Sequence, residues 1–109
     1  MRLEELQTLL NSFGLPLAYE LFPEESDPKP PYLVYMSQER GTDLKADNIT
    51  HKRRRPIRVE LYTVKKNPQL EDDFEDFLDS QEIPFSFEGS MWISSEQLQM
   101  TAWTLTIMY

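Results

Sequence analysis

The spacing of apolar residues changes along this chain between a helical and a strand period, which limits the folds it can adopt. Two segments repeat apolar residues every three or four positions: Leu3, Leu6, Leu10 and Phe13 in the first, and Leu70, Phe74, Phe77 and Leu78 in the second. This spacing predicts helices over residues 2–13 and 68–80. Gly14 is placed to end the first helix, and Asn67 and Pro68 are typical residues for the start of the second.

Other segments have the composition or the alternation of strands. They are residues 17–22, 32–38, 57–64, 83–87, 91–93 and 103–109, of which the first is expected to be a short link or strand. Gly89 and Ser90 form a turn signal, so we expect a hairpin turn there. Residues 94–99 are expected to bulge or turn before the last strand.

These elements predict an α+β fold: a mixed, mainly antiparallel sheet of about four to five strands, packed with two helices. The 109 residues are the usual size of one domain. Residues 39–56 show no apolar period, which predicts a long loop between the second and third strands. We therefore expect one domain, residues 1–109, with a projecting basic loop at about 40–56.

Charge is divided unevenly along the chain. The net charge is −8, yet residues 40–58 hold seven of the eleven Lys and Arg residues and only two acids, Asp43 and Asp47. This segment carries +5 and the rest of the chain carries −13. A negative body opposes general binding to nucleic acid, because phosphates repel it. The sequence therefore predicts a positive projection on an acidic domain.

Composition excludes several kinds of chemistry. There is no cysteine, so disulfides, thiolate metal sites and cysteine nucleophiles are ruled out, which fits a reducing compartment. No apolar run approaches the roughly 20 residues that span a bilayer. The first residues lack the basic-then-apolar order of a signal peptide. By default, these features favour a cytoplasmic location.

The search for a catalytic or metal-binding site predicts none. His51 is the one histidine, and it stands beside a run of cations with no evident orienting partner. The acids of the EDDFED segment, residues 71–76, lack EF-hand spacing and are expected to form a solvated helix face. Three glycines cannot build a phosphate-binding loop. We therefore expect no enzyme activity, no cofactor and no metal.

Core packing does not explain the basic segment, for which three interpretations remain. It could be a solvated loop with incidental charge, or a contact to nucleic acid, since four consecutive cations attract phosphate. It could also contact protein, because a basic projection and an acidic body on one chain can pair head to tail and close into a ring. The absence of aromatic residues between positions 36 and 62 weakens the nucleic-acid interpretation.

The order of the parts resembles the tail completion proteins, also called tail terminator or head–tail joining proteins, of long-tailed bacteriophages and prophages. The resemblance covers nearly the whole chain. After an N-terminal helix it rests on the segments LAYELFP (17–23), PYLVYM (31–36), ADNI (46–49), VELYT (59–63), NPQLEDDFEDFLDSQEIPF (67–85) and MWISSEQLQMTAWTLTI (91–107). Each segment is weakly specific alone, and their order and spacing carry the resemblance.

The resemblance implies a compact α+β virion subunit without catalytic residues. Such proteins form a ring, often a hexamer, that caps the tail tube and joins it to the head connector. Their long loop between strands tends to be a contact element, which here implies assembly contacts at Lys45, Lys52, Arg53, Arg54 and Arg55. We expect these cations to meet acids of a neighbouring subunit, on the helix face of Glu71, Asp72, Asp73, Glu75 and Asp76.

Two alternatives remain beside this expectation. The chain could be another neck or tail-tube protein, since such small virion proteins share size and composition. It could also be a small regulatory or nucleic-acid-binding module that uses the basic loop. Under the first reading, its partners are copies of itself and tail-tube or head-connector proteins, with no membrane. Its location is then the virion, and the host cytoplasm during assembly.

Overall fold

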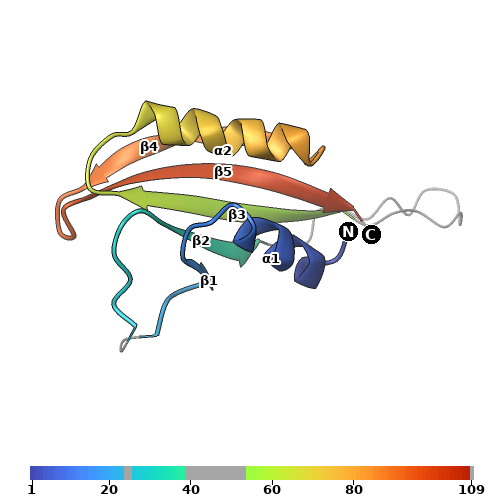
Figure 1. The fold of residues 1–109 in the computed structure, drawn as a ribbon, viewed down its shortest axis with the longest axis horizontal. Coiled ribbons are helices and arrows are strands. Elements are labelled where there is room, and N and C mark those ends of the chain that lie inside the picture. Colours follow the sequence, from blue (N-terminus) through green and yellow to red (C-terminus); the bar gives the residue numbers. More distant parts are fainter. Residues whose placement is uncertain (24–25, 39–53, 109) are drawn as a thin grey trace, which may run out of the picture.

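A computed structural model describes residues 1–23, 26–38 and 54–108. It contains two helices and five strands (Figure 1). In chain order these are α1 (Leu3–Asn11), β1 (Leu17–Tyr19), β2 (Tyr32–Ser37), β3 (Arg54–Thr63), α2 (Pro68–Ser80), β4 (Phe85–Ile93) and β5 (Leu98–Met108). The predicted α+β fold class is confirmed.

The five strands form one sheet in the order β1-β2-β3-β5-β4. The pair β1–β2 is parallel and the other three pairs are antiparallel, so the sheet is mixed, as predicted. The long strands β3 and β5 occupy the middle, where Val59 lies opposite Trp103. The short β1 and the nine-residue β4 form the two edges.

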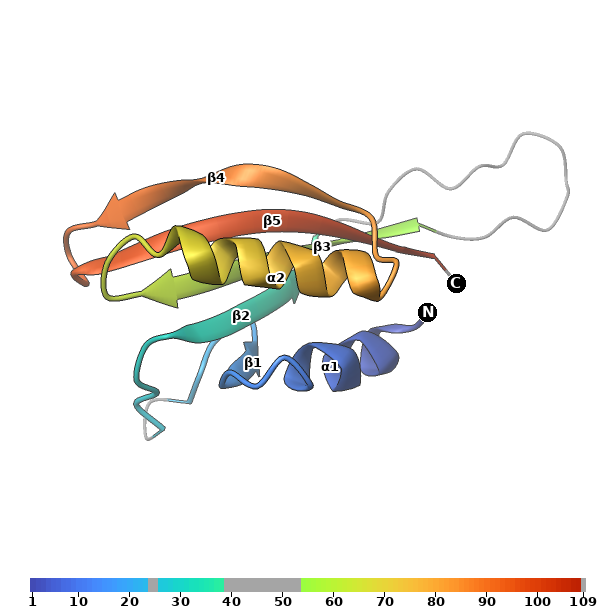
Figure 2. The same ribbon diagram turned by 45° about the horizontal axis from the view of Figure 1, so that its top comes forward.

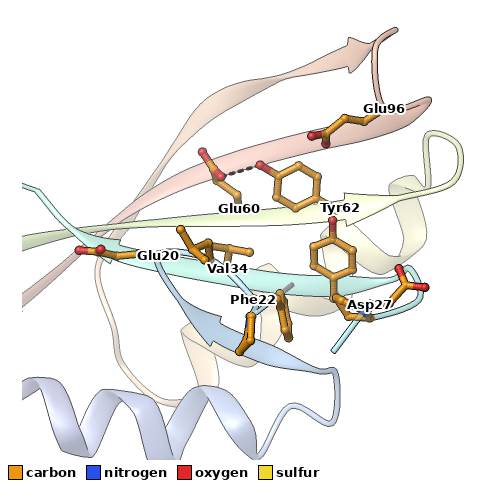
Figure 3. Close-up of a pocket in the computed structure, with 11 residues that line it drawn as sticks. Glu20, Phe22, Asp27, Val34, Glu60, Tyr62 and Glu96 are labelled. Carbon is orange, nitrogen blue, oxygen red and sulfur yellow. Dashed lines mark hydrogen bonds between the residues drawn. The ribbon is translucent and has the colours of Figure 1, made fainter. Parts of the chain in front are cut away.

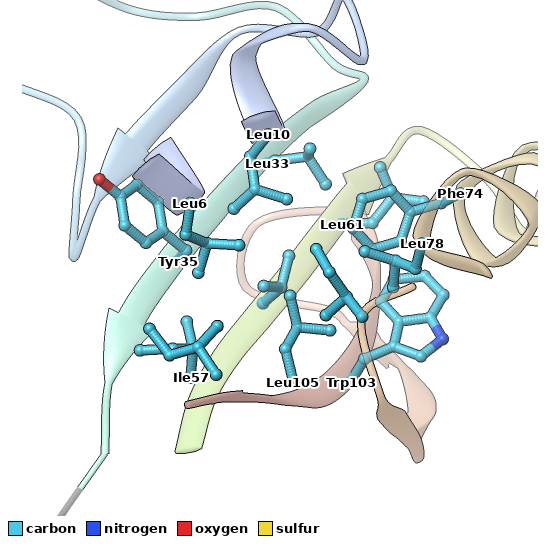
Figure 4. Close-up of a cluster of buried hydrophobic side chains, with 13 residues drawn as sticks. Leu6, Leu10, Leu33, Tyr35, Ile57, Leu61, Phe74, Leu78, Trp103 and Leu105 are labelled. Carbon is cyan, nitrogen blue, oxygen red and sulfur yellow. The ribbon is translucent and has the colours of Figure 1, made fainter. Parts of the chain in front are cut away.

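Both helices pack against the same face of this sheet (Figure 2). The core contains side chains from both helices, from the three inner strands and, at Ile83, from the segment between α2 and β4: Leu6, Leu10, Leu33, Tyr35, Ile57, Val59, Leu61, Phe74, Leu78, Ile83, Trp103, Leu105 and Ile107. Figure 4 shows that the side chains of the helices and those of the strands meet in one cluster. Phe13 joins the helices, since its ring centroid lies 5.2 Å from that of Phe74. The structure is therefore two layers, with the helices on one face only.

The predicted helix α2 is confirmed to the residue. The side-chain oxygen of Asn67 accepts a hydrogen bond from the backbone N–H of Leu70 at 3.2 Å, and Pro68 opens the helix. The predicted first helix is right in kind and shorter at both ends, since α1 covers Leu3–Asn11. No helix among the described residues is long and apolar enough to cross a membrane.

Several predicted strand boundaries are wrong, and the last strand, β5, begins at Leu98 instead of residue 103. The turn expected at Gly89 and Ser90 is a bulge, since β4 runs through both residues and its register against β5 shifts between Phe87 and Gly89. The hairpin turn lies further on, at residues 94–97. In addition, β3 begins at Arg54 instead of residue 57, because Arg54 and Arg55 pair with the end of β5. Most of the expected loop, residues 39–53, lies outside the described residues.

Candidate functional site

The predicted basic contact is only partly described by the structure. Lys45, Lys52, Arg53 and His51 lie outside the described residues. Arg54 and Arg55 are described, and they belong to a strand and not to a loop. Their backbones pair with Met108 and Ile107 of β5, which fixes their direction.

The two described arginines point to different faces of the sheet. Arg54 is exposed and alternates with Arg55, which is half-buried on the helix side. Arg55 lines a small pocket of about 220 Å³ together with Arg2, Leu3 and Glu4 at the start of α1. Of these two arginines, Arg54 is therefore better placed to reach another molecule.

The acidic face expected on α2 divides into two groups. Glu71 is 9% exposed, and its carboxylate accepts hydrogen bonds from Lys66 Nζ at 2.9 Å and from Thr101 Oγ1 at 3.0 Å. Glu75 accepts a hydrogen bond from Trp103 Nε1 at 2.7 Å. These two acids attach the helix to β5, so the expectation that they form part of a solvated face is wrong.

The remaining acids of the predicted contact are exposed. Asp72, Asp73 and Asp76 lie on the outer surface of α2, where Asp73 accepts a hydrogen bond from Gln69 at 2.8 Å. The spacing of the apolar residues could have separated the two groups. Glu71 is three residues before Phe74 and seven before Leu78, which places it on the buried side of the helix.

The sheet face opposite the helices carries the features that sequence analysis missed. We call it the open face, because neither described helix covers it. Alternation along β3 places Arg58, Glu60 and Tyr62 on this face, opposite Met36, Val34 and Tyr32 of β2. Such alternation was visible in the sequence, yet the partners of each side chain depend on the strand register.

Glu60 joins two neighbours on the open face. Its carboxylate accepts a hydrogen bond from Arg58 Nε at 2.8 Å and another from the hydroxyl of Tyr62 at 2.7 Å. Burial, and then the hydrogen bond and charge of Glu60, raise the pKa of Tyr62 well above its ordinary value. Burial also raises the pKa of Tyr32, and the negative charge of Glu96 adds to the shift. The carboxylates of Glu60 and Glu96 therefore lie close enough to these rings to act on their hydroxyl groups.

A pocket of about 300 Å³ opens beside these rings (Figure 3). Residues 20–23, 27 and 28, which lie between β1 and β2, form one wall, and β2, β3 and the turn after β4 contribute to the others. Its polar and aromatic lining comprises Glu20, Phe22, Asp27, Tyr32, Glu60, Tyr62 and Glu96. Of the described residues that line it, four are carboxylates and none is Lys or Arg. We call this feature the acidic–aromatic pocket.

The edge strand β4 exposes large apolar side chains. Phe87, Met91 and Trp92 have exposed fractions of 53%, 55% and 50%. Phe87 and Trp92 lie on the helix side of the sheet, and Met91 lies on the open face, opposite Met100. The outer backbone edge of β4 has no strand partner among the described residues. An unpaired edge flanked by apolar side chains is a typical place for another chain to bind.

No metal site is formed by the part of the chain that the structure describes, since no three acids or histidines there converge as ligands. No protein-family model matches the chain, and a search of curated proteins finds no similar sequence.

Proposed function

We propose that this chain is a structural subunit that assembles with copies of itself, as a tail terminator or head–tail joining subunit of a long-tailed bacteriophage or prophage does. In that role it would form a ring that caps the tail tube. The alternative within the same class is another neck or tail-tube protein.

The observation that carries the proposal is the exposed apolar edge of the sheet. About half of the surface of Phe87, Met91 and Trp92 is open to water, on the two faces of a strand whose outer edge pairs with no other strand of the described chain. Burying this apolar area against another subunit is favourable at roughly 25 cal/mol per Å². A strand or side-chain contact there supports assembly, because it would satisfy both the apolar and the backbone groups of β4.

Two further features support the same proposal. The observed fold class is the one that the resemblance to tail terminator proteins implies. Charge is also divided unevenly along the chain, since residues 40–58 carry +5 and the remaining residues carry −13. Opposite charges on one subunit favour head-to-tail contacts, which close into rings when the rotation between subunits permits.

The proposed role of β4 in assembly is tested by placing charged side chains on this strand. We expect Met91→Lys combined with Trp92→Lys to abolish assembly seen by sedimentation velocity and negative-stain electron microscopy. The fold should persist, since both side chains are exposed. Val64→Lys is the matched control, because Val64 is 63% exposed and lies outside β4. A wild-type chain that stays monomeric up to its solubility limit would contradict self-assembly.

The phage assignment has an independent test in the genome. Genes for portal, capsid and tail proteins next to the gene for this chain would support it. A neighbourhood of unrelated metabolic or regulatory genes would count against it, whatever the oligomeric state.

A further inference from the structure

We propose that the acidic–aromatic pocket binds the cations at residues 52–54 of a second copy of this chain. This inference rests on the proposed function, since it names the contact by which one subunit would hold the next. The acidic partner of these cations is then the pocket on the open face, and not the surface of α2 that the sequence led us to expect.

The chemistry of the pocket suits a guanidinium or ammonium group. Three rings line it in contact with one another: the centroids of Phe22 and Tyr32 lie 5.2 Å apart, edge to face, and those of Tyr32 and Tyr62 lie 5.1 Å apart, stacked. A cation is attracted to ring faces, and an arginine can stack on a ring while it donates hydrogen bonds to carboxylates. Glu20 and Glu96 are exposed carboxylates in the same lining.

Described cations of the same chain neutralise only part of the negative charge of the pocket lining. Arg58 neutralises part of the charge of Glu60, with which it forms an ion pair. Glu20, Asp27 and Glu96 have no ion pair within 4 Å among the described residues. The pocket therefore keeps a net negative charge of the sign that a basic segment requires.

The chain cannot place its own Arg54 in its own pocket. Arg54 begins β3 and Tyr62, which lines the pocket, lies eight residues further along the same strand. A strand rises about 3.3 Å per residue, so the two positions lie roughly 26 Å apart. The basic segment ends at Arg54 and Arg55, both held in the sheet. A second copy placed head to tail could bring these two ends together, and repetition of that contact closes into a ring when the rotation between subunits permits.

The outer surface of α2 is a weaker acceptor. Glu71 and Glu75 are occupied by hydrogen bonds within the chain, which leaves Asp72, Asp73 and Asp76 on a convex helix. Exposed ion pairs on a convex surface contribute little, because water and salt screen them. The pocket adds concave shape and aromatic rings to its carboxylates.

Binding can be measured directly with a peptide. We would label a peptide of residues 50–58, THKRRRPIR, and titrate it with the full chain at low salt, following fluorescence anisotropy. We expect saturable binding that Glu20→Gln combined with Glu96→Gln weakens by about fivefold or more. Both substitutions keep side-chain size and lie on the surface, so the fold should be unchanged.

Matched controls separate the pocket from general attraction. Asp72→Asn combined with Asp76→Asn removes the same charge from α2, and we expect it to leave peptide affinity within about twofold of wild type. A peptide with Gln at positions 52–55 should not bind. Equal losses in the pocket and helix variants, or no binding to the wild type, would overturn the pocket inference.

Sedimentation of the same variants tells this inference apart from the proposed function. Assembly that weakens in the pocket variant and persists in the helix variant supports both. Assembly unaffected by the pocket variant, with no peptide binding, overturns the pocket and leaves self-assembly standing. A wild type that stays monomeric while it binds the peptide overturns contact between copies, and shows that the pocket recognises a basic segment.

Discussion

Two carboxylates of this chain each connect neighbouring side chains, because a buried charge is stable only where hydrogen-bond donors surround it. Glu71 and Glu60 illustrate this on opposite faces of the sheet. Glu71 has Lys66 and Thr101 as donors, and Glu60 has Arg58 and Tyr62. Neither acid is available as a simple surface charge, although the sequence alone suggests a solvated position for Glu71.

The role of Glu71 predicts a clear difference between neighbours on α2. Glu71→Ala removes two hydrogen bonds, one of which is also the ion pair with Lys66, at a position that is 9% exposed. We expect it to lower the free energy of unfolding by about 1–3 kcal/mol. Asp72→Ala, at an exposed position, should change it by less than about 0.5 kcal/mol. Urea unfolding followed by circular dichroism measures both, and equal effects would refute this role of Glu71.

At the scale of elements, α2 was predictable because its signals are local. Asn67, Pro68 and the apolar stripe all act within one helix, and the observed bounds match them. The strand β4 was mispredicted because Gly89 and Ser90 are typical of a turn, whereas in the structure they pair with Ala102 and Thr101 of β5. The same glycine supports either a turn or a bulge, and the pairing of β5 decides between them.

The bulge can be tested at Gly89. Its φ is +125°, a conformation that residues with a Cβ rarely adopt, although no atom lies within 4 Å of the position that a Cβ would take. Gly89→Ala should therefore destabilise the fold by about 1–3 kcal/mol through backbone strain alone. Ser86→Ala, exposed on the same strand, is the control. Thermal unfolding that is unchanged in both variants would show that Gly89 is not strained.

At the scale of the whole molecule, one core holds two helices on one face of a twisted sheet. Phe74 lies at its centre, with its ring centroid 5.2 Å from that of Phe13 on the α1 side and 4.9 Å from that of Trp103 in β5. These three rings thus connect the segment after α1 with α2, and α2 with β5. The other face of the sheet carries polar groups and the acidic–aromatic pocket, and the edge strand β4 exposes apolar side chains on both faces.

The central position of Phe74 predicts a large loss on truncation. Phe74→Ala should lower the free energy of unfolding by about 3–5 kcal/mol, because it leaves a cavity among both helices and the sheet. That is a large part of the roughly 5–15 kcal/mol typical of a domain. Phe77→Ala, at a half-buried position, should cost less. Denaturant unfolding ranks the two, and a larger loss for Phe77→Ala would contradict this account of the core.

The sequence by itself determined the fold class, both helices and the separation of charge, because these follow from periodicity and from counting residues. Only the tertiary structure decided which partners each acid meets. It turned Glu71 and Glu75 toward β5, and it brought Glu20, Tyr32, Glu60, Tyr62 and Glu96 around one pocket. The physical reason is register. Which side chains meet across a sheet depends on how strands far apart in the chain pair, and no local pattern specifies that pairing.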